Sequence, residues 1–533
     1  MASGPALSGG VRAGLLTAGA AAASGVLIAV SNAIGVGVVL GLLLLVGAAR
    51  LDPKKLALVG LIVVLLARTI EIATAWAPTT YIDEIATAYI TVVLVIRRLL
   101  AGHPLRRPPG IWLFAAFAFC GVLSSIVSAV PLAIASAGGI LVVKGVLLYF
   151  ALAQIDWTRD DIPWLVRTAA WVVSIALFCA LINLVLPAQW TAVFANTGQA
   201  QYRSFLPSLI GPFTHPLQFG NFMSMVAIAC ATPLLYRART RPRPPGATAL
   251  FLASAVSAVL SFRRTAVVGM LAGLSYLALR RRNASLLVTA LLVVPVAGVV
   301  LYPVFRDVAE ATYQNFIVDG AENARTRMTV DSVALAFQHF PFGVGFGRFG
   351  SAIARDFYSI EYYRLGYDAV NGLGSPGNPN NHGRWLTDTQ WPAIVGEAGL
   401  VGAAFFVAGL WRILTTFRKA SHAAFLPVRL LGLTGVGWIF HILLLSVAYP
   451  VFVTPPTSAM LFGLAGITYV ILAGSLSEPA AVEESRDAAQ GAEGAAARDL
   501  VRPGPAVRRR RALALGEVPD PDDEGSPQGR YPR

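Results

Sequence analysis

The chain has 533 residues, of which 56% are hydrophobic and only 13% are charged, and its mean hydropathy is +0.65. A soluble domain carries about 25% charged residues, so this composition excludes an ordinary soluble protein and indicates a multi-pass membrane protein. The net charge of +14 does not indicate a nucleic-acid partner, because the basic residues gather in short loops between apolar runs.

Apolar runs predict the membrane helices, since about 20 such residues cross a hydrocarbon layer about 30 Å thick. The sequence predicts an all-α fold with about 12–14 membrane helices and one large loop that contains short helices. The runs start near residues 13, 34, 56, 82, 111, 133, 164, 214, 247, 265, 284, 391, 428 and 457.

The predicted organisation has four parts. Residues 1–302 form the N-terminal membrane helices, 303–390 the large loop, 391–474 three further membrane helices, and 475–533 a tail with too few apolar residues to fold. Basic clusters alternate along the chain, at Arg50, Arg97 and Arg98, Arg237, Arg280 and Arg418. By the positive-inside rule these loops and both termini are cytoplasmic, and the large loop is extracytoplasmic.

Several polar residues lie at or near membrane depth. Arg68 and Glu71 are three apart and predict an ion pair on one helix face. Lys144 lies inside an apolar run, where a charge costs several kcal/mol without a partner or a wet cavity; both explanations stay open. His215 opens the helix near residue 214 and is either a hydrogen-bonded structural residue or part of a site. The three cysteines lie in apolar runs and are interpreted as packing residues.

The junction VLSFRRTAVVG places Arg263 and Arg264 at the outer face, with no acidic residue nearby in the sequence. Two such charges need an anionic partner, and the planar guanidinium suits a phosphate because it bonds two oxygens at once. The alternative is an ion pair with a distant acid such as Glu397.

In the large loop, residues 327–340 predict an amphipathic helix that packs on the membrane helices or lies in the interface. Its apolar residues are Val330, Val333, Leu335, Ala336 and Phe337. Gly345, Gly347 and Gly350 then match the dinucleotide-binding pattern formally, but no strand precedes them. We interpret them as a tight turn that brings the backbone close to a helix end.

The last polar stretch contains His382, Arg384 and Asp388, before a helix that carries Glu397. Asp388, His382 and Glu397 are the candidate catalytic residues. Histidine and aspartate side chains can accept a proton from a sugar hydroxyl in suitable surroundings.

Four stretches carry a resemblance over about residues 200–410: GPFTHPLQFGNF, SFRRTAVVG, RTRMTVDSVALAFQHFPFGVGFGRFG and GEAGLVGAAFF. In their order, and in the large loop followed by three helices, the chain resembles the O-antigen ligase and polymerase superfamily. The resemblance implies a bacterial cytoplasmic-membrane enzyme that transfers an oligosaccharide from a polyprenyl-diphosphate donor to a glycan acceptor, with inversion. It implies no metal, nucleotide sugar or other cofactor.

The resemblance also implies roles for individual residues. Arg264 and Arg327, with Arg263 and with Arg325 as the alternative to Arg327, would hold the donor diphosphate. Asp388 or His382 would take the proton from the acceptor hydroxyl. Ligases of the superfamily usually carry a histidine nine residues before the glutamate that corresponds to Glu397, where this chain has Asp388; polymerases often carry an aspartate there. The chain therefore resembles a polymerase more than a ligase.

Two other classes of function compete with the glycosyltransferase. A transporter or flippase of lipid-linked glycans would also need buried cations, but transporters are usually built from repeats with a site near the midplane. This sequence has no obvious repeat, and its charges gather beside one loop. A structural membrane protein without chemistry would leave Arg263 and Arg264 unexplained.

Overall fold

The computed structural model describes residues 51–74, 77–195, 197–203, 206–236, 245–281, 324–378, 381 and 383–475. The described residues up to 472 form one compact unit, and residues 473–475 lie outside it. The predicted helices near residues 13, 34 and 284, the predicted tail from 476 onward and His382 lie outside the described residues.

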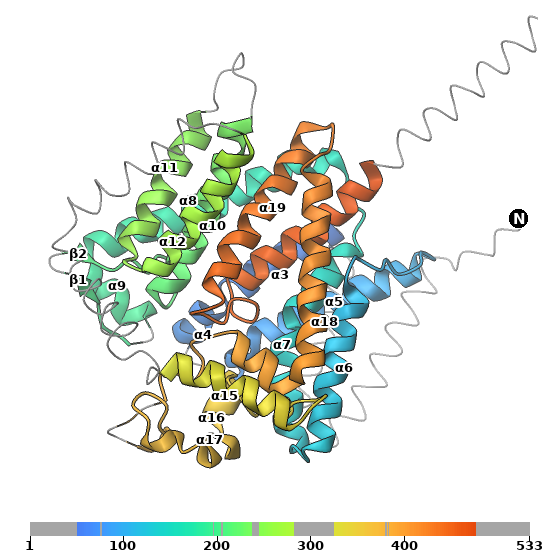
Figure 1. Cartoon of the computed structure of the whole chain (residues 1–533). Coiled ribbons are helices and arrows are strands. Elements are labelled where there is room, and N and C mark those ends of the chain that lie inside the picture. Colours follow the sequence, from blue (N-terminus) through green and yellow to red (C-terminus); the bar gives the residue numbers. More distant parts are fainter. Residues whose placement is uncertain are drawn as a thin grey trace, which may run out of the picture. The chain divides into compact units, whose positions relative to one another are not determined.

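The described residues are mostly helical (Figure 1). The longer helices are α3 (Pro53–Leu65), α5 (Ile82–Leu100), α6 (Ile111–Val127), α7 (Leu132–Ala153), α8 (Ile162–Val185), α10 (Pro216–Tyr236), α11 (Pro245–Leu260), α12 (Arg264–Arg280), α15 (Ala324–Gln338), α18 (Trp391–Ala420), α19 (Leu426–Leu445) and a helix over Thr457–Ser475. The shorter elements are α4 (Ala67–Thr74), α9 (Pro187–Phe194), α16 (Ala352–Asp356), α17 (Ile360–Arg364) and three 3-10 turns, η1 (Ala77–Tyr81), η2 (Arg159–Asp161) and η5 (Tyr367–Ala369). β1 (Tyr202–Arg203) pairs antiparallel with β2 (Leu206–Pro207).

Seven of the described helices are long and apolar enough to cross a membrane, or eight if the bent pair α3 and α4 is one span. This number is below the 12–14 expected, because α6, α11 and α12 are shorter than a full span and three predicted runs are not described. Large apolar side chains on the outer faces of α6 and α8 are exposed, among them Trp112 at 67% and Trp171 at 66%. Such surfaces suit lipid rather than water.

Small residues let the helices of the core approach closely, as is usual in membrane bundles. α18 packs on α6 and α19, and α12 packs on α10 and α19. A methyl group on Gly273 of α12 would come within 2.9 Å of the Gly437 carbonyl oxygen of α19, and one on Gly409 of α18 would clash with Phe114 of α6.

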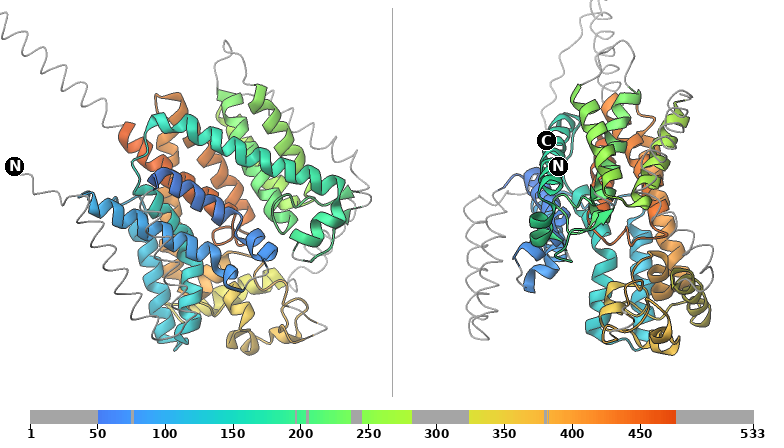
Figure 2. Two further views of the ribbon diagram at one scale, coloured as in Figure 1. Left: turned by 180° about the vertical axis from the view of Figure 1, so that it is seen from behind. Right: turned by 90° about the vertical axis from the view of Figure 1, so that its left-hand side faces the viewer.

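The short helices α15, α16 and α17 gather at one end of α6, α7 and α18 (Figure 2). α15 confirms the helix expected over 327–340, but its apolar residues divide between two faces. Met328, Leu335 and Ala336 are buried, since α15 packs on α18, while Val330, Val333 and Phe337 are 61%, 38% and 65% exposed. At about 100° per residue, the exposed residues form a separate stripe that α18 does not cover.

The glycine-rich turn packs against a break inside α18. Gly345, Gly347 and Gly350 have φ angles of 92°, 76° and 71°, and Gly399 of α18 has a φ of 73°. The N–H groups of Val344 and Gly345 donate to the carbonyls of Gly396 and Glu397, at 2.9 and 3.0 Å. The expected approach of backbone to a helix is therefore present, at an interruption within the helix rather than at its end.

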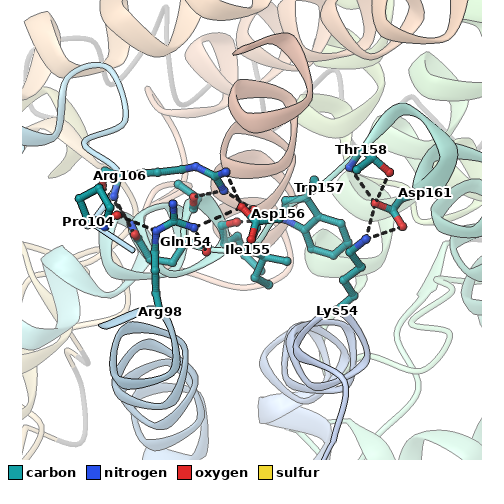
Figure 3. Close-up of polar contacts among 12 residues, drawn as sticks. Lys54, Arg98, Pro104, Arg106, Gln154, Ile155, Asp156, Trp157, Thr158 and Asp161 are labelled. Carbon is teal, nitrogen blue, oxygen red and sulfur yellow. Dashed lines mark hydrogen bonds and ion pairs between the residues drawn. The ribbon is translucent and has the colours of Figure 1, made fainter. Parts of the chain in front are cut away.

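At the far end of α7, the connection to α8 is held by basic residues from the first turn of α3, the last turn of α5 and the segment between α5 and α6 (Figure 3). Lys54 Nζ donates to both carboxylate oxygens of Asp161, at 2.8 and 2.7 Å, and Arg98 and Arg106 form ion pairs with Asp156. Arg98, one of the basic residues expected to be cytoplasmic, therefore lies at this end of the helices.

Gly345→Ala should destabilise the protein by at least about 2 kcal/mol. The left-handed backbone costs a non-glycine residue about 1–2 kcal/mol, and a methyl group would lie 2.7 Å from the Ser125 Cα and 2.6 Å from a Val130 methyl group. Thermal unfolding in detergent measures the loss. Gly377→Ala is the matched control, because nothing lies within 4 Å of the added methyl group. Equal unfolding temperatures for the two variants would contradict this account of the turn.

Candidate functional site

Arg263 and Arg264 lie where α11 turns into α12. The turn passes through Phe262, with a φ of 50°, and Arg263 is the extended residue that precedes the first helical residue, Arg264. Arg263 Nη2 donates to Gln201 Oε1 at 2.6 Å. The dipole of α12 adds partial positive charge at its start, beside the two guanidinium groups.

The segment 324–390 brings an acid to these arginines. Arg325, in the first turn of α15, forms an ion pair with Asp388, and its guanidinium lies 4.7 Å from the ring centre of Trp385. The Trp385 N–H donates to the Gly372 carbonyl at 3.0 Å, which anchors this part of the segment. A stacked, ion-paired guanidinium is held in one orientation.

These groups interact electrostatically as one cluster. Burial and repulsion from Arg203 lower the pKa of Arg263, while Asp388 raises it. Arg264 experiences the charge of Arg325. Four arginines therefore influence one another, and two of them, Arg263 and Arg325, interact with Asp388.

Burial raises the pKa of the Asp388 carboxyl, against the opposing effects of Arg325 and Arg263. Its side chain is 28% exposed, so ligand can reach it. A carboxylate with a raised pKa is a stronger proton acceptor than a free one.

His215 directly precedes α10, and its Nδ1 accepts a hydrogen bond from the Leu217 N–H at 3.2 Å. Burial, together with the nearby charge of Arg263, lowers the pKa of His215 to about 4. The imidazole is therefore neutral near pH 7. It lines a small hollow with Gln201, the partner of Arg263.

Arg327 lies away from this cluster. It forms an ion pair with Asp331 at 3.7 Å, donates to the Leu365 carbonyl at 3.1 Å and lies 5.9 Å from the ring centre of Tyr367. The sequence preferred Arg327 over Arg325 for the diphosphate; the structure places Arg325 beside Asp388 instead.

Glu397 is buried at the break in α18. Its Oε1 accepts hydrogen bonds from Ser351 Oγ at 2.6 Å and from the Phe349 N–H at 3.2 Å, so it fixes the glycine-rich turn. The acid that interacts with Arg263 is Asp388, not Glu397. Sequence reasoning grouped Glu397 with the proton acceptors, and its contacts are those of a positioning residue.

Lys144 has both a charged partner and a cavity beside it, which are the two explanations that the sequence left open. Its Nζ lies 2.5 Å from Asp83 and 2.6 Å from Glu84, both on α5, and it also lines a cavity of about 190 Å³. Sequence reasoning did not single out Asp83 and Glu84. Acidic residues at the start of a membrane helix are candidates for a functional site for the same reason as the lysine. Sequence reasoning also missed Arg203 and Gln201, which lie in a loop without a recognisable pattern.

Among the described residues, no group of three or more His, Cys, Asp or Glu side chains is arranged to hold a metal ion. No protein-family model matches this chain, and a search of curated proteins finds no match either.

His215→Asn should remove part of the acid sensitivity of the protein. The folded pKa of about 4 lies below the ordinary value of 6.5, so the unfolded chain binds the proton more tightly. The contribution of neutral His215 is therefore present above pH 6.5 and is lost as the pH falls toward 4, by about 3 kcal/mol.

Unfolding midpoints in detergent at pH 7, 5 and 4 measure this effect. Asparagine can still accept the Leu217 hydrogen bond as a helix cap, so the variant should match the wild type at pH 7 and lose less stability at pH 4. Identical pH profiles for wild type and variant would contradict a depressed pKa.

Proposed function

We propose that this chain is a metal-independent glycosyltransferase of the O-antigen polymerase type in the bacterial cytoplasmic membrane. It would transfer an oligosaccharide from a polyprenyl-diphosphate donor to a glycan acceptor at the outer face. The single observation that carries the proposal is that Arg325 and Arg263 both interact with Asp388, with Arg264 close to Arg325, beside apolar helices.

Guanidinium groups gathered at one place suit a diphosphate at the membrane surface, because each can bond two of its oxygens. Arg263 already donates to Gln201 through Nη2, but its buried Nε makes no hydrogen bond within the described residues. As the glycosyl bond breaks, negative charge grows on the leaving diphosphate. Preorganised guanidinium groups stabilise such charge without a metal, and the exposed apolar faces of the helices suit the polyprenyl chain.

Asp388 would act as the base. The acceptor hydroxyl oxygen attacks the anomeric carbon, the bond from that carbon to the diphosphate oxygen breaks, and the hydroxyl proton passes to Asp388. Attack from the face opposite the leaving group inverts the configuration. The Arg325 ion pair holds the carboxylate, and its raised pKa favours proton acceptance. His382 stays the alternative base.

Ligase-type transfer of a finished glycan to a different acceptor is the nearest alternative, since the arginines would serve it equally well. Asp388 in the position where ligases usually carry a histidine favours the polymerase. Transport of a lipid-linked glycan would use the same charges, but it assigns no role to Asp388.

Purified protein in lipid, given a labelled lipid-diphosphate-linked oligosaccharide as sole substrate, should produce a ladder of multiples on a sizing gel. A ladder identifies a polymerase. Transfer that requires a second acceptor would identify a ligase. Absence of product under both conditions, with folded protein, would overturn the proposed enzyme class in favour of transport.

Arg325→Gln should lower the transfer rate about 100-fold or more, which is typical when one preorganised donor to a developing anion is lost. Arg327→Gln is a matched control two residues away on α15, because Arg327 bonds Asp331 and Leu365 instead. It should stay within a few-fold of the wild type. Both variants are first compared with the wild type by size-exclusion chromatography and unfolding temperature. Equal losses of transfer rate in two folded variants would contradict the assignment of the diphosphate site to Arg325 rather than to Arg327.

A further inference from the structure

A cavity of about 190 Å³ lies between α5, α7, α16 and the segments 387–390 and 450–455. Its charged lining residues are Arg68, Asp83, Glu84, Lys144 and Arg355, and its wall also includes hydroxyl groups. Pockets for drug-sized ligands measure about 300–1,000 Å³, so this cavity suits a single small polar unit rather than a lipid tail.

The charges of this cavity are neutralised by neighbouring side chains. Lys144 pairs with Asp83 and Glu84, Arg68 with Glu71, and Arg355 with Asp356. An anion would gain little from cations that already have carboxylate partners. The cavity therefore favours an uncharged ligand.

The wall offers hydrogen-bonding groups that the protein leaves unused. Thr389 is only 4% exposed and lines the cavity, and its hydroxyl makes no hydrogen bond with any described residue. The Oε2 atom of Glu84 likewise makes no hydrogen bond with any described residue. A buried polar atom without a partner costs about 1–3 kcal/mol. A ligand with several hydroxyl groups would supply donors and acceptors to such a wall.

The cavity adjoins the proposed base. Thr387 and Thr389 line it, and Asp388 between them forms the ion pair with Arg325. The short segment 387–389 thus contacts the polar cavity and the cationic cluster at once. A hydroxyl-bearing ligand that contacts Thr387 or Thr389 would therefore contact a residue next to Asp388 in the chain.

We propose that this cavity binds a neutral sugar unit through its hydroxyl groups. Resting on the proposed function, we assign it as the site of the acceptor glycan's reacting sugar. The two substrates would then be separated by charge, with the diphosphate at the arginine cluster and the uncharged sugar in the cavity.

Direct binding tests the cavity without any transfer reaction. Saturation-transfer NMR is recorded on the full chain in nanodiscs with the methyl glycosides of glucose, galactose, mannose and N-acetylglucosamine. Methyl glucuronoside is the anionic comparison. At least one neutral glycoside should bind, and the glucuronoside should bind at least about tenfold more weakly. Binding of the anionic glycoside alone, or of none, overturns the proposal.

Two variants locate the binding. Ala352→Phe narrows the cavity without removing a charge and should abolish the signal. Thr389→Val keeps the shape of the side chain and removes only the unbonded hydroxyl, so the fold should persist while affinity falls about three- to tenfold. Thr415→Val, on α18 and outside the cavity wall, should bind like the wild type. Unchanged binding in both cavity variants overturns the site.

Different results would overturn the proposed glycosyltransferase and the proposed acceptor site. Sugar binding that Ala352→Phe abolishes, in a protein that performs no transfer, supports the cavity and overturns the glycosyltransferase. Transfer to a soluble oligosaccharide acceptor with the same acceptor KM in wild type, Ala352→Phe and Thr389→Val supports the glycosyltransferase and overturns the acceptor site.

Discussion

The contact between the glycine-rich turn and the break in α18 is the constraint on which the site depends. A helix interrupted near a membrane exposes carbonyl groups that lipid cannot satisfy. The N–H groups of Val344 and Gly345 bond the carbonyls of Gly396 and Glu397, and the Glu397 side chain holds Ser351. This short stretch joins the segment 324–390 to α18, so the position of Asp388, three residues before α18, follows from it.

α7 is fixed at both ends. Near its start, Gly138 allows the backbone of Gly347 to approach within a distance that any side chain would prevent. After its end, the carboxylates of Asp156 and Asp161 are held by basic residues of α3, of α5 and of the segment that follows α5. Lys144 lies between these two attachments. Because α7 is fixed on both sides of it, its buried ammonium group stays beside the two carboxylates of α5.

The two polar regions of the molecule differ in their charged groups. In the arginine cluster, Arg325 and Arg263 both interact with Asp388, and Arg203 and Arg264 lie close to these two arginines. In the cavity, Lys144 has two acidic partners and each arginine has one. Charges in a protein interior are costly unless paired. A group of guanidinium groups therefore suits an anionic ligand, and a cavity whose charges are paired suits a ligand that offers hydrogen bonds.

The sequence by itself determined the helices, through apolar runs, and the tight turn, through glycines that alone tolerate its backbone angles. It also placed Arg263 and Arg264 at a helix junction and predicted the Arg68–Glu71 pair, because these features depend on neighbours in the chain. Only the tertiary structure shows that Arg325, and not Arg327, lies beside Asp388. Residues two apart on a helix point in nearly opposite directions, and the sequence does not state which side faces Asp388, 63 residues away. The partners of Lys144 and the anchoring role of Glu397 were likewise decided by contacts distant in sequence, which no local pattern records.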